Sequence, residues 1–400
     1  MNDAVTLALE RNPRVLIALQ EIEAAGGRAL QAGRIPNPEI GVRWNGTPGN
    51  FDVREADERD IGVSQQIEFP GRRSGRIEVA SVDGEITALA LERVRTLVEA
   101  DVRKAYFRAR CSQDIVSGLG EQLGLLGDVQ RLLEDRYATG SGAYLDVLRA
   151  RIEVARIRND LAEAKRDMQT RGARLNVLLG NDPGHVLLLT DSLHRGASVM
   201  MADSLLRVLL EKSAAMRIAR LEVARQDAAL GLAKTSYFPD FTLGIFHQRR
   251  AGEPPFDANR YTGTTVNALG IELGFSIPLW FWHEPKGQVQ EAAALKTIAE
   301  VNSGDVVRRV RAGIQDAIAA VKGAVMLVNG FEQSTLDDAR DIVATGITMY
   351  QNNRIDLLNL LDIYRTARAT RLEYARALLT YHVALADLAS AGELPPGDEH

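Results

Sequence analysis

Residues 60–76, DIGVSQQIEFPGRRSGR, contain a change from the periodicity of a strand to that of a helix. Apolar side chains at Ile61, Val63, Ile67 and Phe69 alternate with small or polar ones, and this period of two places them on one face of a strand. A Pro-Gly pair then interrupts the pattern, and apolar residues beyond it recur every three or four positions. The stretch therefore predicts a short strand that leads into a long helix.

The same change occurs a second time, in residues 267–288, NALGIELGFSIPLWFWHEPKGQ. Upstream of the two junctions, residues 8–42 align without a gap with residues 209–243. Such self-similarity indicates a tandem repeat. We expect a mainly α protein with a small β part, in which each repeat holds a helix, two strands and a long α-helical hairpin.

The periodicity sets the expected boundaries of these parts. The first repeat covers residues 1–200, with strands at 40–45 and 60–69, a helical hairpin at 77–179 and a linker. The second covers residues 201–390, with strands at 241–248 and 267–277 and a hairpin at 287–389, and residues 391–400 form a disordered tail. With roughly sixty residues in each leg, such a hairpin would be about 90 Å long and would need neighbouring helices.

The composition excludes several classes of function. The 400 residues include 48 Lys and Arg against 53 Asp and Glu, a net charge of −5, so no nucleic-acid partner is expected. The single cysteine, Cys111, falls in a helical pattern and has no second thiol with which to bind a metal. There is no run of eighteen apolar residues, so no transmembrane helix is expected, and the sequence begins in an amphipathic helix rather than a signal peptide.

The four predicted strands have the length and the alternation of strands that cross a bilayer. The alternative is a soluble four-stranded sheet packed on one side against helices. A proline borders every strand at its helix-facing end, and that level carries residue types that suit a lipid interface, namely Arg72, Arg73, Trp280, Phe281 and Trp282. Because four strands cannot close a barrel and open edges are not tolerated in lipid, we expect three chains to supply twelve strands.

Together these features resemble the TolC-like outer-membrane efflux protein family over nearly the whole chain. The motifs that carry the resemblance are Asn12-Pro13, PNPEI at residues 36–40, QIEFPGRR at 66–73, and two hairpin tips, RYATGSGAYLDVLRA at 136–150 and MYQNNRIDLLNLLDI at 349–363. The junction at 66–73 is most similar to the heavy-metal branch that includes CzcC and CusC proteins. The chain departs from the family in lacking a signal peptide and a lipid-bearing cysteine near its start. Its second tip also lacks the glycine that the first tip has.

The resemblance implies a homotrimer whose strands form a 12-stranded transmembrane β-barrel in the outer membrane of a Gram-negative bacterium, continuous with a periplasmic α-helical barrel. It also implies two partners, a periplasmic adaptor and an inner-membrane RND-type pump. The expected function is that of a passive exit channel for heavy-metal cations. The alternatives are a duct of the same family for drugs or proteins, and a coiled-coil periplasmic tether that transports nothing.

The two tips supply the candidate functional residues. Those at the exposed breaks, expected to contact the adaptor, are Gly140, Ser141, Gly142, Asn353, Arg354 and Ile355. Those just inside the tips, expected to form a pore or gate, are Asp146, Tyr350, Asn359 and Asp362. By family position Asp362 would line the pore, and a threefold ring of its carboxylates would favour cations. The alternatives are an ordinary turn for the tips and a helix-stabilising charge for Asp362.

No residue pattern indicates an enzyme or a metal site. The six histidines are scattered and form no HExxH motif. No serine or cysteine stands in a recognisable arrangement with a base. We therefore expect no catalytic residue, no cofactor and no metal ligand.

Overall fold

The computed structural model describes residues 1–46, 53, 56–191, 193–194, 203–250, 265–280, 282–332, 335–352 and 354–393. The chain divides into two compact units. One comprises Met1–Gln20, Leu89–Arg217 and Asp305–His400, and the other comprises Glu21–Ala88 and Ile218–Gly304. Each unit therefore combines parts of both sequence repeats. The expected fold class, mainly helical with a small antiparallel sheet, is confirmed.

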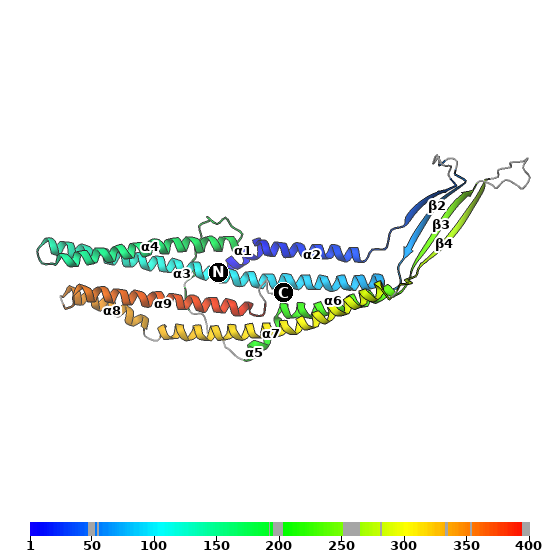
Figure 1. Ribbon diagram of the computed structural model, residues 1–400. Coiled ribbons are helices and arrows are strands. Elements are labelled where there is room, and N and C mark those ends of the chain that lie inside the picture. The colour runs from blue at the N-terminus through cyan, green and yellow to red at the C-terminus, as the bar shows by residue number, and fades with distance from the viewer. Residues whose placement is uncertain are drawn as a thin grey trace, which may run out of the picture. The chain divides into compact units, whose positions relative to one another are not determined.

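Two rounds of the same element order make up the chain (Figure 1). The first consists of α1 (Asn2–Arg11), α2 (Pro13–Ala32), β1 (Glu39–Asn45), β2 (Glu58–Ile67), α3 (Arg72–Ala138) and α4 (Tyr144–Leu178). The second consists of α5 (Asp203–Lys212), α6 (Ala214–Lys234), a 3₁₀ turn (Thr235–Tyr237), β3 (Asp240–Arg250), β4 (Val266–Ser276), α7 (Glu284–Glu332), α8 (Thr335–Gln351) and α9 (Leu357–Ser390). The helical hairpins are α3 with α4, and α7 and α8 with α9.

The boundaries differ from the expected ones mainly where strand and helix meet. β2 ends at Ile67 rather than at residue 69, and α3 begins at Arg72 rather than at residue 77. Gly71 adopts a φ of +102°, and its carbonyl accepts the Gly75 N–H at 2.8 Å. The helix therefore begins directly after the glycine turn. In the second repeat the ascending leg is divided into α7 and α8, close to the weak helix former Gly330.

A buried polar contact recurs at the start of α2 and of α6. Asn12 accepts an N–H of the first turn of α2 at 2.9 Å and donates to the Leu178 carbonyl at 2.8 Å. Ser213, which aligns with Asn12 in the gapless repeat, accepts an N–H of α6 at 3.1 Å and donates to the Gly392 carbonyl at 2.5 Å. In each repeat, one N-cap side chain thus ties the start of a helix to the end of the last helix of that repeat.

The end of the chain corrects part of the tail prediction. Residues 391–393 were expected to be disordered, but the carboxylate of Glu393 accepts the N–H groups of Ala214 and Ala215 at 2.8 and 3.0 Å. The first N–H groups of a helix have no partner within the helix, so a carboxylate is held there. Residues 394–400 lie outside the described residues.

An apolar cluster close to the hairpin tips joins both hairpins. Its most buried members come from four helices: Leu126 and Leu133 of α3, Val147 and Ile157 of α4, Tyr350 of α8, and Leu360 of α9. Each hairpin therefore buries its apolar stripe against the other.

Two ion pairs connect α4 with α9 beside this cluster. Arg365 donates to both carboxylate oxygens of Glu153, at 3.2 and 2.6 Å, and Arg368 donates to Asp160 at 2.5 Å. The Glu153 side chain is 7% exposed, whereas that of Arg365 is 49% exposed. The bonds from Arg365 hold the pKa of Glu153 below its usual range despite the burial of the carboxylate, so Glu153 stays charged.

We expect loss of either partner of the Glu153–Arg365 pair to have unequal effects. Arg365→Met leaves a buried carboxylate without its bidentate partner and should lower the free energy of unfolding by roughly 3 kcal/mol. Glu153→Gln leaves a half-exposed guanidinium that water solvates, and should cost about 1 kcal/mol. Urea unfolding followed by circular dichroism measures both variants, and equal losses would contradict this account.

The same pair predicts a pH dependence. Because the pKa of Glu153 is lower in the folded than in the unfolded chain, its contribution is present above the ordinary glutamate pKa. It is lost as the pH falls through the lowered value. The Glu153→Gln variant should therefore lose less stability than the wild type when the pH is lowered through this range.

Candidate functional site

The four strands form one antiparallel sheet in the order β1-β2-β3-β4. Successive ladders pair Ile40 with Val63, Val63 with Ile245, and Ile245 with Ile271, so these side chains form a row on one face. Among the described strands, β1 and β4 each have a neighbour on one side only. The N–H and C=O groups along these two edges are a template for pairing with another chain.

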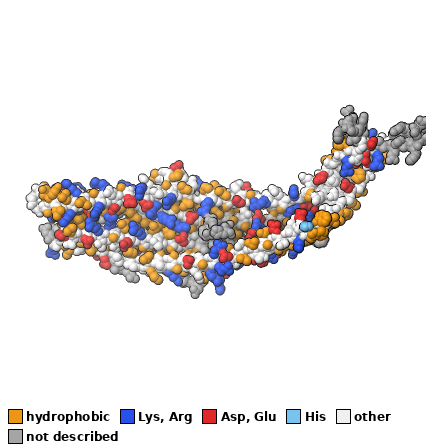
Figure 2. Space-filling model, viewed as in Figure 1, with side chains coloured by type: hydrophobic (Ala, Val, Ile, Leu, Met, Phe, Trp, Pro, Cys, Tyr) orange, Lys and Arg blue, Asp and Glu red, His pale blue; other side chains and the backbone are white. Residues whose placement is uncertain are grey.

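One face of the sheet is apolar and exposed, and Figure 2 shows hydrophobic side chains gathered along one side of the strands. Its large hydrophobic residues, each at least 44% exposed, are Ile40, Val42, Trp44, Ile61, Val63, Leu243, Ile245, Leu269, Ile271, Leu273 and Phe275. These exposures contradict the alternative of a soluble sheet packed against helices. An apolar surface of this kind indicates contact with lipid or with another protein.

The opposite face carries polar, charged and small residues. Successive rows across the strands are Glu39, Ser64, Gly244 and Glu272, then Gly41, Gly62, Phe246 and Gly270, then Arg43, Asp60, Gln248 and Ala268, and finally Asn45, Glu58, Arg250 and Val266. A Cβ atom on Gly270 would lie 2.3 Å from the Phe246 ring, so only glycine fits where this ring crosses the sheet. The polar composition of this face suits contact with water.

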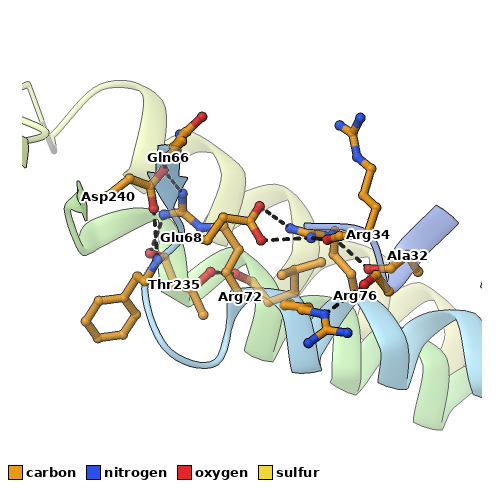
Figure 3. Close-up of polar contacts among 12 residues, drawn as sticks. Ala32, Arg34, Gln66, Glu68, Arg72, Arg76, Thr235 and Asp240 are labelled. Carbon is orange, nitrogen blue, oxygen red and sulfur yellow. Dashed lines mark hydrogen bonds and ion pairs between the residues drawn. The ribbon is translucent and has the colours of Figure 1, made fainter. Parts of the chain in front are cut away.

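Arg72 fixes the junction between β2 and α3 to the start of β3 (Figure 3). Its guanidinium pairs with Asp240 and donates to the carbonyls of Thr235 and Phe238, at 3.0 and 3.3 Å. Asp240 also accepts the Phe69 N–H at 3.0 Å, and the rings of Phe69 and Phe238 stack with their centroids 4.2 Å apart. The side chains of Arg72 and Asp240 are 22% and 14% exposed. The lipid contact predicted for Arg72 stays a prediction, and the bonds that Arg72 makes are internal.

Arg76 and Arg73 attach the same junction to the end of α2. Arg76 donates to both oxygens of Glu68, at 2.5 and 2.9 Å, and to the carbonyls of Ala32 and Arg34 (Figure 3). The paired carboxylate raises the pKa of the Arg76 guanidinium. Arg73 is exposed and donates to the Gly33 carbonyl at 2.8 Å. The three arginines of residues 72–76 thus hold the segments that enter and leave the sheet.

The second junction, between β4 and α7, has aromatic residues where the first has arginines. Trp280 and Trp282 are 67% and 49% exposed, and their rings make an edge contact at 5.5 Å. Phe281, predicted with them as an interface residue, lies outside the described residues. The exposure of the two tryptophans is compatible with the predicted place at a lipid interface.

The first hairpin tip is a tight glycine turn. Gly140 adopts a φ of +76°, and its N–H donates to the Tyr137 carbonyl at 3.0 Å, while the Ser141 N–H donates to the Arg136 carbonyl at 2.9 Å. A Cβ on Gly142 would lie 3.0 Å from the Cβ of Arg136. Both glycines are therefore required by the turn itself, and Gly140 and Ser141 are exposed at its end.

The second tip makes its turn without glycine. The Arg354 N–H donates to the Met349 carbonyl at 2.8 Å, and Asp356 caps α9 by accepting the Asn359 N–H at 2.9 Å. Ile355 packs against the apolar cluster near the tips. Asn353, predicted as an adaptor contact, lies outside the described residues. Sequence reasoning missed the cap by Asp356, although an aspartate three positions before Asn359 is an N-cap signal.

Behind the tips, the predicted gate residues do not form one cluster. Tyr350 is buried, its ring lies 5.5 Å from the Arg136 guanidinium, and burial raises the pKa of its hydroxyl. Asp146 pairs with Arg149 on its own helix at 3.5 Å. Asn359 and Asp362 are exposed. Within one chain, the structure thus brings Tyr350 together with Arg136, a residue that sequence reasoning did not select.

A model of the outer membrane efflux protein family matches residues 4–181 and 205–392 of this chain. The chain belongs to this family. The family resemblance read from the junction and tip motifs is therefore confirmed, and it places this efflux protein in the outer membrane, with its helices in the periplasm.

Several known proteins are similar to this efflux protein. It is 24% identical to the cobalt-zinc-cadmium resistance protein CzcC of Cupriavidus metallidurans, over 95% of this chain and 87% of CzcC. It is 20% identical to the probable outer membrane lipoprotein SilC of Salmonella typhimurium, over 91% of this chain and 79% of SilC. The crystal structure of CusC has a TM-score of 0.78 and 18% identity, over 98% of this chain and 92% of that one.

Membership of the family sets aside the tether alternative, since family members are outer-membrane channels. No three His, Cys, Asp or Glu side chains of the described residues group closely enough to hold a metal ion. The segment Glu284–Gln351 contains an 18-residue window with a mean hydropathy of 1.2, which passes a length and composition test for a spanning helix and so corrects the expectation that none would. A single segment of this kind is weak evidence, because core helices of soluble proteins pass the same test.

We expect Arg72→Met to weaken the junction. The substitution leaves Asp240 and two carbonyls without their main donor, and should lower the free energy of unfolding in detergent micelles by roughly 2–3 kcal/mol. Arg73→Met is the matched control, because the exposed Arg73 makes a single bond and its loss should cost less than about 0.5 kcal/mol. Urea titration followed by tryptophan fluorescence measures the difference, and equal midpoints for the two variants would show that Arg72 does not hold the junction.

Proposed function

We propose that three copies of this chain close their sheets into a shared 12-stranded barrel and form the exit channel of a tripartite efflux system. The observation that carries the proposal is a sheet with an exposed apolar face, a polar opposite face and two unpaired edges. In lipid, such a sheet satisfies its backbone groups only in a closed barrel, with the apolar face outward and the polar face around water. Twelve strands are enough to enclose a channel.

The proposed cargo is heavy-metal cations. The names of two relatives support this class: CzcC is a cobalt-zinc-cadmium resistance protein and NccC a nickel-cobalt-cadmium resistance protein. The polar face of the sheet fits a cationic cargo, because on its described residues carboxylates outnumber guanidinium groups. The carboxylates are those of Glu39, Glu58, Asp60, Asp240 and Glu272, and the guanidinium groups those of Arg43 and Arg250. The channel conducts passively, and the pump and adaptor deliver the substrate.

Conductance in planar lipid bilayers tests this function together with the pore role of Asp362. We expect the wild-type trimer to form cation-selective channels that pass Zn²⁺ or Co²⁺ as chloride salts. Asp362→Asn removes three charges from the proposed ring and should move the reversal potential toward zero in a salt gradient. Asp337→Asn, which alters an exposed carboxylate of α8 away from the tips, is the control. An unchanged reversal potential in Asp362→Asn would remove Asp362 from the pore, and absence of any conductance would refute the channel itself.

The tips are proposed to contact the periplasmic adaptor. Gly140, Ser141 and Arg354 are exposed at the ends of the two hairpins, and a break at the end of a helical hairpin offers backbone groups to a partner. A photo-crosslinking amino acid at Ser141 or Arg354 should give a covalent product with the adaptor in cells, and the same amino acid at the exposed Arg166 in the middle of α4 should give none. Products of equal yield from all three positions would contradict a specific tip contact.

A further inference from the structure

The ladder between β2 and β3 shows how the end of one strand pair meets the start of the next. Ile67 pairs with Phe241, so the register places Phe69, the residue before Pro70, level with Pro239. The Phe69 ring is fixed there by its stacking on Phe238. The free edges stand in the same relation if they come from two copies, because Pro278 follows β4 and Pro38 precedes β1.

We propose that β4 pairs with β1 of the next copy in the register that this ladder defines, with Ile277 level with Pro38. In that register Glu272 lies opposite Arg43 of the next copy, and the two form an ion pair across the seam. This inference rests on the trimer proposed above and adds to it the register and the charged pair that stabilises it.

The apolar face supports this register. It places Phe275 opposite Ile40, Leu273 opposite Val42 and Ile271 opposite Trp44 of the next copy. All six side chains are large, hydrophobic and at least 45% exposed in one chain. The seam would therefore continue the apolar face without interruption, whereas a shift by one residue would turn every side chain of one strand to the wrong face.

The polar face supports the ion pair. The Arg43 side chain is 72% exposed, and its nearest carboxylate, that of Asp60, is 4.0 Å away. One oxygen of Asp60 is buried and accepts no hydrogen bond from the described residues. Glu272 is exposed and likewise has no ion-pair partner among them. In the proposed seam, the Arg43 guanidinium lies between Asp60 of its own chain and Glu272 of the next, and its fork of donors serves both carboxylates.

The tilt of the strands gives an independent check. The row that runs through Ile40, Val63, Ile245 and Ile271 would meet Trp44 of the next copy, an advance of four residues per chain. Over twelve strands this advance corresponds to a tilt of about 35°, within the usual range of roughly 35–45° for membrane barrels. A register with two residues less advance gives about 20°. One with two more gives about 46° and places Pro278, which lacks an N–H, opposite Glu39 inside β1.

Disulfide formation between copies tests the register. In a Cys111→Ser background, which removes the buried native thiol, Glu272→Cys combined with Arg43→Cys should give covalent trimers on oxidation. Glu272→Cys combined with Gly41→Cys, or with Asn45→Cys, reports the two shifted registers and should give none. The readout is electrophoresis of heated, unreduced samples. Covalent trimers from a shifted pair, with none from the 272/43 pair, would overturn the proposed register.

Charge exchange tests the ion pair. Glu272→Arg and Arg43→Glu should each lower the temperature at which the trimer dissociates in detergent, and the double exchange should restore the wild-type value. Glu39→Arg is the control, since Glu39 faces Ser276 in the proposed register and its change should not be rescued by Arg43→Glu. Additive losses in the double exchange would overturn the pair. A wild-type chain that forms no trimer would instead refute the proposed assembly, which separates the two failures.

Discussion

The structure depends on one constraint, which is that a sheet in lipid can leave no backbone N–H or C=O group unpaired. Three of the strand interfaces that one chain can make are satisfied internally, and the outer edges of β1 and β4 are not. The exposed apolar face excludes burial of the sheet in water as a stable arrangement, because its side chains would stay hydrated. The sheet is therefore complete only when other copies supply the missing edges, and the polar face is then turned toward the enclosed water.

The sequence predicts those parts of the fold that depend on local periodicity. The period of two between residues 60 and 69 identifies β2, and the gapless alignment of the repeats identifies its neighbours. The ends of the strands were less accurate, since β2 stops at Ile67. That boundary depends on the left-handed φ of Gly71 and on bonds to a distant part of the chain, neither of which affects the apolar pattern.

The partners of the charged residues were beyond the sequence for a similar reason. Arg72 and Asp240 are 168 positions apart, and Glu153 and Arg365 are 212 apart. A pattern shows that an arginine lies at the end of a strand, but only the three-dimensional path of the chain shows which carboxylate it meets. The tips illustrate the opposite case, since the turn at Gly140 is local and the sequence places it correctly. The contact of Arg136 with Tyr350 joins two hairpins and has no local signal.

Comparison of the two junctions suggests why the repeats diverged where they did. In the gapless alignment Asp240 corresponds to Glu39, and counting back from the two prolines, Arg72 corresponds to Trp280. Arg72 and Asp240 belong to one chain and are both present as soon as that chain folds, so their largely buried charges are never left unpaired. A junction between copies must instead exist for a time without its partner, and a buried charge there would carry a large desolvation cost. Tryptophan avoids this cost, because its ring is stable at a lipid interface before assembly and can pack against protein afterwards. The charged residues proposed for the seam, Glu272 and Arg43, lie on the wet face of the sheet, where water solvates them until the copies meet.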